Sequence, residues 1–557
     1  MIDFKKRLRN LFSPVFHAIP VKVTLGLLAK MAPFINDELK SELSTGLSAE
    51  PPRGIGNALR APAQMAADAI NIGRPLPDAA TQLLIEKSVL GFLTKITTAA
   101  EKTKQNRLQN DVIAELSYEW RREVRSLAGL QPNPEDTAPK LEDIAAETEF
   151  LIAHQHSFAP VFKRLKARRV LYAGQCYYYS WYLSRALRKL DWRADVLNWD
   201  PNPASQIFYH GQDFQIGAPG LVSEAELLSF YVQSIYSYDV VHFSNSHGIC
   251  FGTGLQNWFR SRCEEHAEIY LLKVFGKAIV YTNNGCLDGV SQTAFSQWGP
   301  LNVCSICRWQ NIPAVCSDER NLIWGVFRNA VADFQCLLGG NRVDFNTDPR
   351  VHEVPEAYCL EPEIWAPDLE IPARLRLPPA AAKLVRVYHA VGNKEERTRA
   401  DGVNIKCTHI YLPLIEKLQR EGVEIELISP DGVPNLDVRF LQMQADIILE
   451  MLTYGWFGTN VREGLMLGKP VICYIRPEWL ESLRAEIPEY AEELPIVSAT
   501  PETVEEILRE LIANPAKRQE LGRRGREFAL KWHSTAVAGR RFDDIYGRLI
   551  DGHGTPS

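Results

Sequence analysis

From residue 168 onward, hydrophobic residues recur as short continuous runs that alternate with runs spaced by three or four positions. An apolar run at 169–173 is followed by a glycine turn, an amphipathic stretch over 177–189, and a second apolar run at 193–199. Short buried runs are typical of strands in parallel sheets, and such strands need a crossover helix between them. The pattern therefore predicts a βαβ unit at this point.

The same alternation continues and then restarts after a proline-rich segment. The first region contains further predicted strands at 239–243 and 277–282, and the proline-rich segment covers roughly 362–380. After it come predicted strands at 384–389, 423–428 and 470–475, and predicted helices at 408–420 and 459–467. Parallel sheets bind ligands at the carboxyl ends of their strands. We therefore expect an α/β fold with two doubly wound parallel sheets that face a cleft.

The N-terminal region has a different character. Residues 1–165 show helical periodicity with few strand-like runs, so we expect a helical extension. The predicted domains are this extension, a first Rossmann-like domain over 166–375, a second Rossmann-like domain over 376–535, and a helix and tail over 536–557. Residues 1–30 combine cations with apolar residues. This segment is either an interfacial helix on anionic lipid or a helix that docks on its own protein.

Composition limits the class of protein. The chain has 557 residues, 46% of them apolar and 23% charged, which predicts two or three globular domains. The net charge of −6 argues against a dedicated nucleic-acid binder. We find no signal peptide and no run of about 18–20 apolar residues, so we expect a cytoplasmic protein without a transmembrane helix, with its 11 cysteines reduced.

The segment 445–472 carries the most informative chemistry. It predicts a strand, a glycine-rich turn, a helix that begins near Thr459, and a further strand. Gly455 and Gly458 permit close approach to the backbone, and the free N–H groups of a helix start can bind a diphosphate. Glu463 lies about one turn into the helix, where its carboxylate can accept hydrogen bonds from two ribose hydroxyls.

This segment resembles the donor-binding stretch of GT-B glycosyltransferases of the family-4 type. Trp456, Phe457 and Gly458 stand in the places of the family's Gly-Phe-Gly, and Glu463 stands in the place of its second glutamate. The first glutamate is replaced by Gly455, and Glu450 is the candidate substitute. The resemblance implies a donor site formed by the following residues: Glu450, Gly455, Trp456, Phe457, Gly458, Thr459, Asn460 and Glu463.

A second match lies upstream, in the segments 387–393 and 403–410. These resemble the family's strand that ends in His-Ala-Pro and its Lys-Gly-Thr helix start, with an insertion between them. The resemblance implies that Lys406 and an arginine face the diphosphate, where they stabilise the charge that grows on it. Arg399 is our candidate for that arginine and Arg397 is the alternative. Solvated loop charges are the other interpretation.

Polar residues after the strands of the first sheet are candidates for the acceptor side. Gly174 and Gln175 form the predicted turn after the first strand. In the family a histidine often ends the strand near the sugars, which makes His242 a catalytic candidate and His247 an acceptor-side candidate. Asn284 follows the next strand, at the place of a family His-Gly.

Cys286, Cys304, Cys307 and Cys316 have the spacing C-x17-C-x2-C-x8-C. A C-x2-C pair can hold a tetrahedral metal from a tight turn, and two more thiolates would complete a structural zinc site. The other interpretation is a set of buried free thiols.

The resemblance implies transfer of a sugar, with retention and without a metal or other catalytic cofactor. The donor would be a UDP-, GDP- or ADP-sugar, and the acceptor a glycan, a lipid-linked glycan or a surface polysaccharide. Two alternatives stay open, namely a nucleotide-sugar epimerase and a catalytically inactive binding or scaffold protein of the same fold.

Overall fold

The computed structural model describes residues 168–551, apart from 175–176, 199–206, 216–233, 235–237, 245–248, 250–268, 270–271, 273–276, 284, 287, 314, 338–340 and 393. The helical extension predicted over 1–165, together with the two interpretations of residues 1–30, lies outside the described residues.

The first sheet has seven parallel strands in the order β3-β2-β1-β4-β5-β6-β7. Their bounds are β1 Arg169–Ala173, β2 Arg193–Asn198, β3 Phe214–Gln215, β4 Val240–Phe243, β5 Ala278–Thr282, β6 Phe334–Leu337 and β7 Val351–Glu353. The strand order reverses between β1 and β4. The predicted βαβ unit is confirmed, since β1 and β2 pair in parallel across α8 (Tyr179–Arg188).

The second sheet has four parallel strands in the order β11-β10-β8-β9. Their bounds are β8 Val385–Tyr388, β9 Ile425–Ile428, β10 Ile447–Leu449 and β11 Val471–Ile472. Here the strand order reverses between β8 and β10. All four strands fall inside or next to the apolar runs of the sequence.

Helices cover the sheets with the apolar faces that their spacing predicts. In α16 (Thr408–Arg420), Tyr411, Leu414, Ile415 and Leu418 recur at three- and four-residue steps, and all four are buried. The other helices are α13 Gln292–Gln297, α14 Asp318–Val331, α15 Lys394–Arg397, α17 Asn435–Met443, α18 Thr459–Met466, α19 Pro477–Glu486, α20 Pro488–Glu493, α21 Val504–Ala513, α22 Pro515–Trp532 and α23 Thr535–Asp551. Short 3-10 turns lie at η2 Val303–Ile306, η3 Asp344–Thr347, η4 Pro355–Ala357 and η5 Ala373–Leu375.

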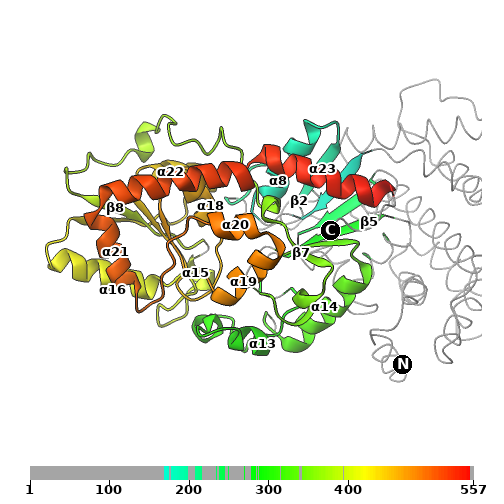
Figure 1. Ribbon diagram of the computed structural model, residues 1–557, viewed down its shortest axis with the longest axis horizontal. Helices are drawn as coiled ribbons and strands as arrows, with labels where there is room; N and C mark the ends of the chain where they lie inside the picture. The colour runs from blue at the N-terminus through cyan, green and yellow to red at the C-terminus, as the bar shows by residue number, and fades with distance from the viewer. Residues whose placement is uncertain are drawn as a thin grey trace, which may run out of the picture.

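The last helix returns to the first sheet. After α22 the chain enters α23, which packs along α8 (Figure 1). Trp192 Nε1 donates to Asp543 Oδ1 of α23 at 2.8 Å, and the hydroxyl of Tyr546 lies 2.5 Å from His242 Nδ1 in β4. We call β1–β7 with their helices and α23 the first lobe, and β8–β11 with the remaining helices the second lobe. Residues of both lobes line one cleft. The predicted α/β fold with two facing parallel sheets, the GT-B arrangement, is confirmed.

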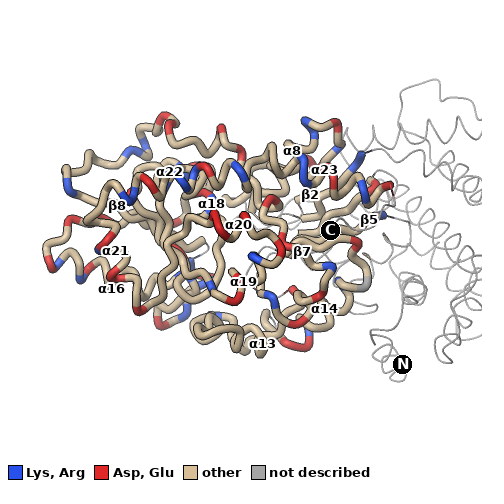
Figure 2. Tube along the Cα trace, in the orientation of Figure 1, with Lys and Arg blue, Asp and Glu red and all other residues tan. Residues whose placement is uncertain are grey.

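Charges are distributed over both lobes. Acidic and basic residues are interspersed along the described part of the chain (Figure 2). No helix within this part combines the length and the apolar character needed to span a bilayer.

An ionic cluster around the buried Glu353 joins the lobes at β7 and α19. Arg342 Nε lies 3.3 Å from Glu353 Oε1, and the same guanidinium pairs with Glu486 of α19. Glu486 also accepts a hydrogen bond from the amide of Glu353 at 2.8 Å. Burial raises the pKa of Glu353 to about 7, against the opposing effect of Arg342.

Candidate functional site

A cleft of about 470 Å³ lies between the lobes. The segments that line it follow the carboxyl ends of strands. Tyr177 follows β1, Gly285 follows β5, and Ala390 and Met451 follow β8 and β10. Because β1/β4 and β8/β10 are the points where the strand order reverses, the cleft lies where open α/β sheets bind their ligands.

The start of α18 opens into this cleft. The helix begins at Thr459, as the sequence predicts, and its N-cap residue Gly458 has no side chain to accept the first free N–H groups. Gly458, Thr459 and Asn460 all line the cleft. Uncapped amides at a helix start carry partial positive charge and bind anions.

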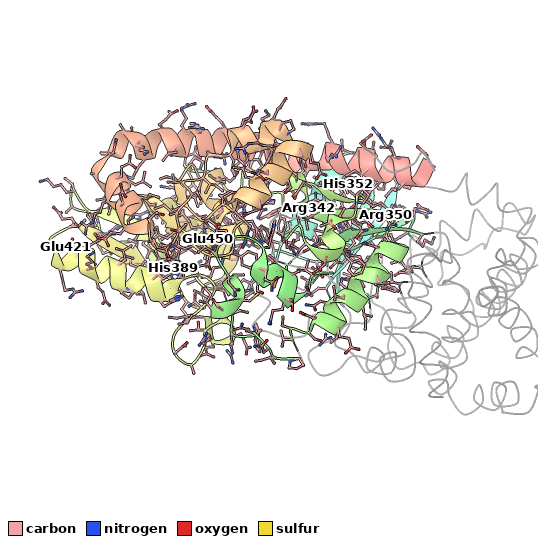
Figure 3. The ribbon with its side chains drawn as sticks, turned by 60° about the horizontal axis from the view of Figure 1, so that its bottom comes forward. Arg342, Arg350, His352, His389, Glu421 and Glu450 are labelled. Atoms are coloured by element: carbon pink, nitrogen blue, oxygen red, sulfur yellow. The ribbon has the colours of Figure 1, made fainter. Side chains whose placement is uncertain are left out.

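Lys406 stands beside this helix start. A Cβ on Gly458 would lie 3.5 Å from Lys406 Nζ, and Lys406 lines the cleft. Its ammonium group is paired with Glu450, which is fully buried just after β10 and close to His389 at the end of β8 (Figure 3). Glu450 Oε1 also accepts from Asn460 Nδ2 at 3.3 Å. Glu450 thus holds both side chains at the helix start without itself lining the cleft.

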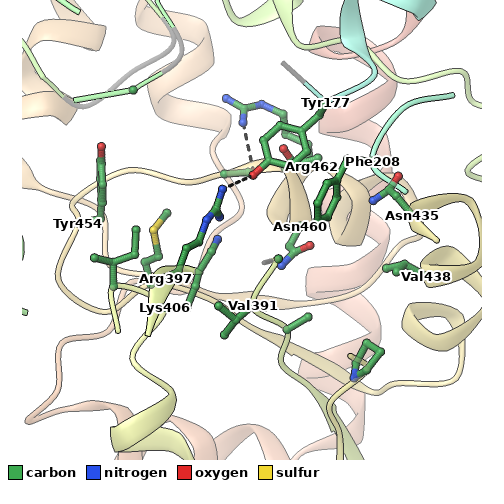
Figure 4. A pocket seen from close by; sticks show the side chains of 18 of the residues that line it. Tyr177, Phe208, Val391, Arg397, Lys406, Asn435, Val438, Tyr454, Asn460 and Arg462 are labelled. Atoms are coloured by element: carbon green, nitrogen blue, oxygen red, sulfur yellow. Dashed lines mark hydrogen bonds between the residues drawn. The ribbon is translucent and has the colours of Figure 1, made fainter. Parts of the chain in front are cut away.

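Of the two arginines that the sequence offered as partners of Lys406, Arg397 lines the cleft and Arg399 does not. Arg397 lines the cleft, and its Nη2 donates to the hydroxyl of Tyr177 at 2.9 Å (Figure 4). Arg399 instead pairs with Asp401 at 2.8 Å and donates to the carbonyl oxygen of Ser305 at 3.0 Å. The assignment to Arg399 is therefore corrected. The inserted residues form α15, and this short helix ends at Arg397, which points toward Tyr177.

The structure also corrects the expected position of Glu463. Its side chain is fully buried and does not line the cleft. The carboxylate accepts from the hydroxyl of Tyr178 at 2.5 Å, from Asn435 Nδ2 at 3.0 Å and from Gln442 Nε2 at 2.7 Å. Burial raises the pKa of Glu463, and these hydrogen bonds oppose the rise. Because this carboxylate is fully buried and held by three donors of the protein, it is not open to ribose hydroxyls in the cleft in this arrangement.

Gly455 has a structural reason for replacing the family's glutamate. Its φ is +97°, which favours glycine, and any side chain there would meet the buried guanidinium of Arg476, with a Cβ 2.8 Å from Arg476 Cβ. Of the neighbouring residues, Trp456 lines the cleft. Phe457 is fully buried against Trp479, with ring centroids 5.7 Å apart, so it serves the core.

His242 does not reach the cleft. It is buried in β4, with Nδ1 2.5 Å from the Tyr546 hydroxyl and Nε2 2.5 Å from Thr282 Oγ1. Burial lowers the pKa of His242 to about 3, so the imidazole is neutral at physiological pH. The catalytic assignment is corrected, because Nδ1 attaches Tyr546 of α23 to the first sheet and Nε2 joins β4 to Thr282 of β5.

The remaining acceptor-side candidates are only partly placed. Gly174 adopts φ +88°, receives the Ser244 hydroxyl on its carbonyl oxygen at 3.1 Å, and does not line the cleft. Gln175, His247 and Asn284 lie outside the described residues.

The four cysteines do not assemble a metal site. All four belong to the described residues, and within these no group of three or more His, Cys, Asp or Glu side chains is placed to hold a metal ion. Cys316 Sγ donates to Gln292 Oε1 at 3.5 Å, and burial raises the pKa of Cys286 and of Cys304 to about 12. The structural zinc site predicted from the spacing is therefore not found among the described residues, where the four side chains are free thiols.

Several residues of the cleft were not among our candidates. Phe208 and Tyr177 come from the first lobe and meet edge to face at 5.7 Å. Asn435 comes from the start of α17, and Arg462 from the first turn of α18. For these residues, the only feature of the sequence that could have pointed to the cleft is that Arg462 directly precedes Glu463 in the donor-binding motif.

Comparison with protein-family models and with curated protein sequences finds no match. Solved structures similar to this chain include sucrose-phosphate synthase from Thermosynechococcus elongatus, at 13% identity over 69% of this chain and 99% of that one, with a TM-score of 0.43. Another is Anabaena HepE in complex with UDP and glucose, at 11% identity over 68% and 99%, with a TM-score of 0.43. A third is WaaG, a glycosyltransferase involved in lipopolysaccharide biosynthesis, at 12% identity over 68% and 100%, with a TM-score of 0.37. Because these scores are below 0.5, the functional proposal rests on the cleft itself.

Proposed function

We propose that this protein transfers a sugar from a nucleotide-sugar to an acceptor hydroxyl in the cleft between the lobes. The observation that carries the proposal is the uncapped start of α18, which meets Lys406 at the reversal point of the second sheet. Arg397 reaches the same cleft from α15. Backbone N–H groups and two cations in one half-enclosed space suit a diphosphate.

The chemistry follows from these charges. The bond between sugar C1 and the diphosphate oxygen breaks, and its electron pair stays on that oxygen. The acceptor oxygen bonds to C1, and its proton passes to the departing diphosphate. Negative charge therefore grows on the diphosphate, where Lys406, Arg397 and the α18 amides stabilise it without reorganising solvent. We propose retention at C1, with the acceptor entering on the face from which the diphosphate leaves.

The two sides of the cleft differ in composition. Phe208 and Val438 lie on one side of the cleft (Figure 4), and together with the segment 430–433 of its lining they offer an apolar surface and backbone groups to a nucleobase. Tyr454 lies on the opposite side, and the lining also includes Asp288 and Trp309. Aromatic rings beside a carboxylate suit the ring face and hydroxyls of a sugar. We therefore propose a glycan or lipid-linked glycan as acceptor.

A thermal-shift screen of UDP-, GDP- and ADP-sugars tests the proposal. A donor at 100 times its Kd adds about 2.7 kcal/mol to the stability. Lys406→Met should abolish the shift, whereas Lys517→Met, which removes a cation from α22, should keep it. The donor found in this way is then incubated with candidate glycans, and released nucleoside diphosphate is measured. A sugar altered on an intact nucleotide would identify an epimerase, and failure of every nucleotide to bind would favour a scaffold protein.

A further inference from the structure

Arg462 is a buried cation without a carboxylate partner. Its side chain is only 4% exposed, and no Asp or Glu oxygen of the described residues lies within 4.0 Å of its guanidinium. Its Nη1 donates to the carbonyl oxygens of Phe457 and Gly458 at 3.1 and 3.2 Å, while its Nε has no partner among the described residues. A buried charge is costly unless an opposite charge accompanies it.

The position of Arg462 on its helix increases this cost. It lies in the first turn of α18, where the helix dipole is positive and a cation is destabilising. The carbonyl oxygen of Gly458 accepts a hydrogen bond from Arg462, and Lys406 Nζ lies 3.5 Å from the position that a Cβ on Gly458 would occupy. Two cations therefore flank the same residue at the helix start. Glu450 neutralises only Lys406.

Two aromatic rings partly stabilise the charge of Arg462 through cation–π contacts. The guanidinium carbon lies 4.5 Å from the ring centroid of Tyr358 and 4.7 Å from that of Phe457. Such contacts hold a planar guanidinium in a fixed direction and contribute modestly to stability. They leave the charge itself without a counter-ion, and Arg462 lines the cleft in which an anion can supply one.

We propose that Arg462 is a third phosphate-binding residue, which contacts the diphosphate of the donor together with Lys406 and the α18 amides. This inference rests on the proposed function for the identity of the ligand. Since the guanidinium is already held by two rings and two carbonyl groups, little side-chain freedom is lost when the phosphate arrives. The site thereby favours ligands with two phosphates over the bare nucleoside.

Calorimetric titration of the full chain with inorganic pyrophosphate, a nucleoside diphosphate and the matching nucleoside tests this role. We expect Arg462→Met to weaken the binding of both phosphate ligands by about 10- to 100-fold, and to leave nucleoside binding unchanged. Arg462→Lys should recover part of the loss because it restores the charge. Arg386→Met is the matched control, since Arg386 is similarly buried in β8 and does not line the cleft.

The outcomes separate this inference from the proposed function. If Arg462→Met lowers the Tm but binds pyrophosphate as the wild type does, Arg462 only braces Tyr358 and Phe457, and the inference is overturned. If the wild type binds pyrophosphate and Arg462→Met does not, but no nucleotide binds to either, the phosphate role stands and the nucleotide-sugar function falls. Loss of pyrophosphate binding in the Arg386→Met control as well would also overturn the inference.

Discussion

Replacing Glu463 with alanine should destabilise the protein more than it weakens nucleotide binding. The carboxylate is fully buried and accepts hydrogen bonds from Tyr178, Asn435 and Gln442. Removing it leaves three donors without an acceptor. Each buried unsatisfied donor costs about 1–3 kcal/mol, and release of the buried charge offsets part of the sum. We therefore expect a loss of about 3–5 kcal/mol in the free energy of unfolding.

Two further variants divide this energy. Tyr178→Phe removes only the donor from the first lobe, so it should cost about 1.5–3 kcal/mol, the value of a hydrogen bond to a charged group. Glu463→Gln keeps the shape but turns an N–H₂ group toward donors, so its cost should lie between those of the other two variants.

Urea denaturation at neutral pH measures the loss, and nucleotide affinity is then titrated at low temperature, where all variants remain folded. The reasoning is refuted if Glu463→Ala unfolds within about 1 kcal/mol of the wild type and yet loses nucleotide binding. That result would mean that the carboxylate contacts the ligand and that a ribose hydroxyl replaces the Tyr178 hydroxyl as its hydrogen-bond donor.

Three other perturbations follow from the same structure. Lys406→Met should weaken nucleotide binding and also cost about 3–5 kcal/mol of stability, because it leaves the charge of Glu450 buried and unpaired. Adding Glu450→Gln to this variant should restore the stability measured by denaturation but should not restore nucleotide binding. Gly455→Glu should lower the Tm sharply instead of restoring a sugar contact, because φ is +97° and Arg476 fills the space; an unchanged Tm would contradict this account. Burial raises the pKa of Glu353 to about 7, so the folded protein favours the protonated carboxyl group. The stability that this group contributes is present below pH 4.5 and is lost as pH rises through about 7, a change of about 3 kcal/mol in the free energy of unfolding. Glu353→Gln should therefore flatten the curve of stability against pH between about pH 4 and 8.

The sequence predicts the local elements well, and the reason is physical. A short apolar run or a glycine before a helix acts through nearby residues, so β1, α16 and the helix start at Thr459 appear close to their predicted bounds. The same is true of Lys406, whose place depends on a turn and the following helix.

Contacts that join distant segments could not be predicted in this way. Tyr178 lies 285 positions before the carboxylate that it binds, and Tyr546 lies 304 positions after His242. Periodicity shows which face of a strand or helix is buried but not what covers it. The choice between Arg397 and Arg399 failed for a smaller reason, since only two positions in an inserted segment separate the arginine that reaches Tyr177 from the one that pairs with Asp401.

The last helix belongs to one half of the molecule by chain order and to the other by packing. Cutting the chain in the proline-rich segment would therefore leave α23 on the wrong fragment. Phe542, Ile545 and Tyr546, which are fully buried against the first lobe, would face water, and His242 would lose its partner. Neither fragment would be a self-sufficient folding unit, so biochemical dissection of this protein calls for point substitutions or for co-expression of the two pieces.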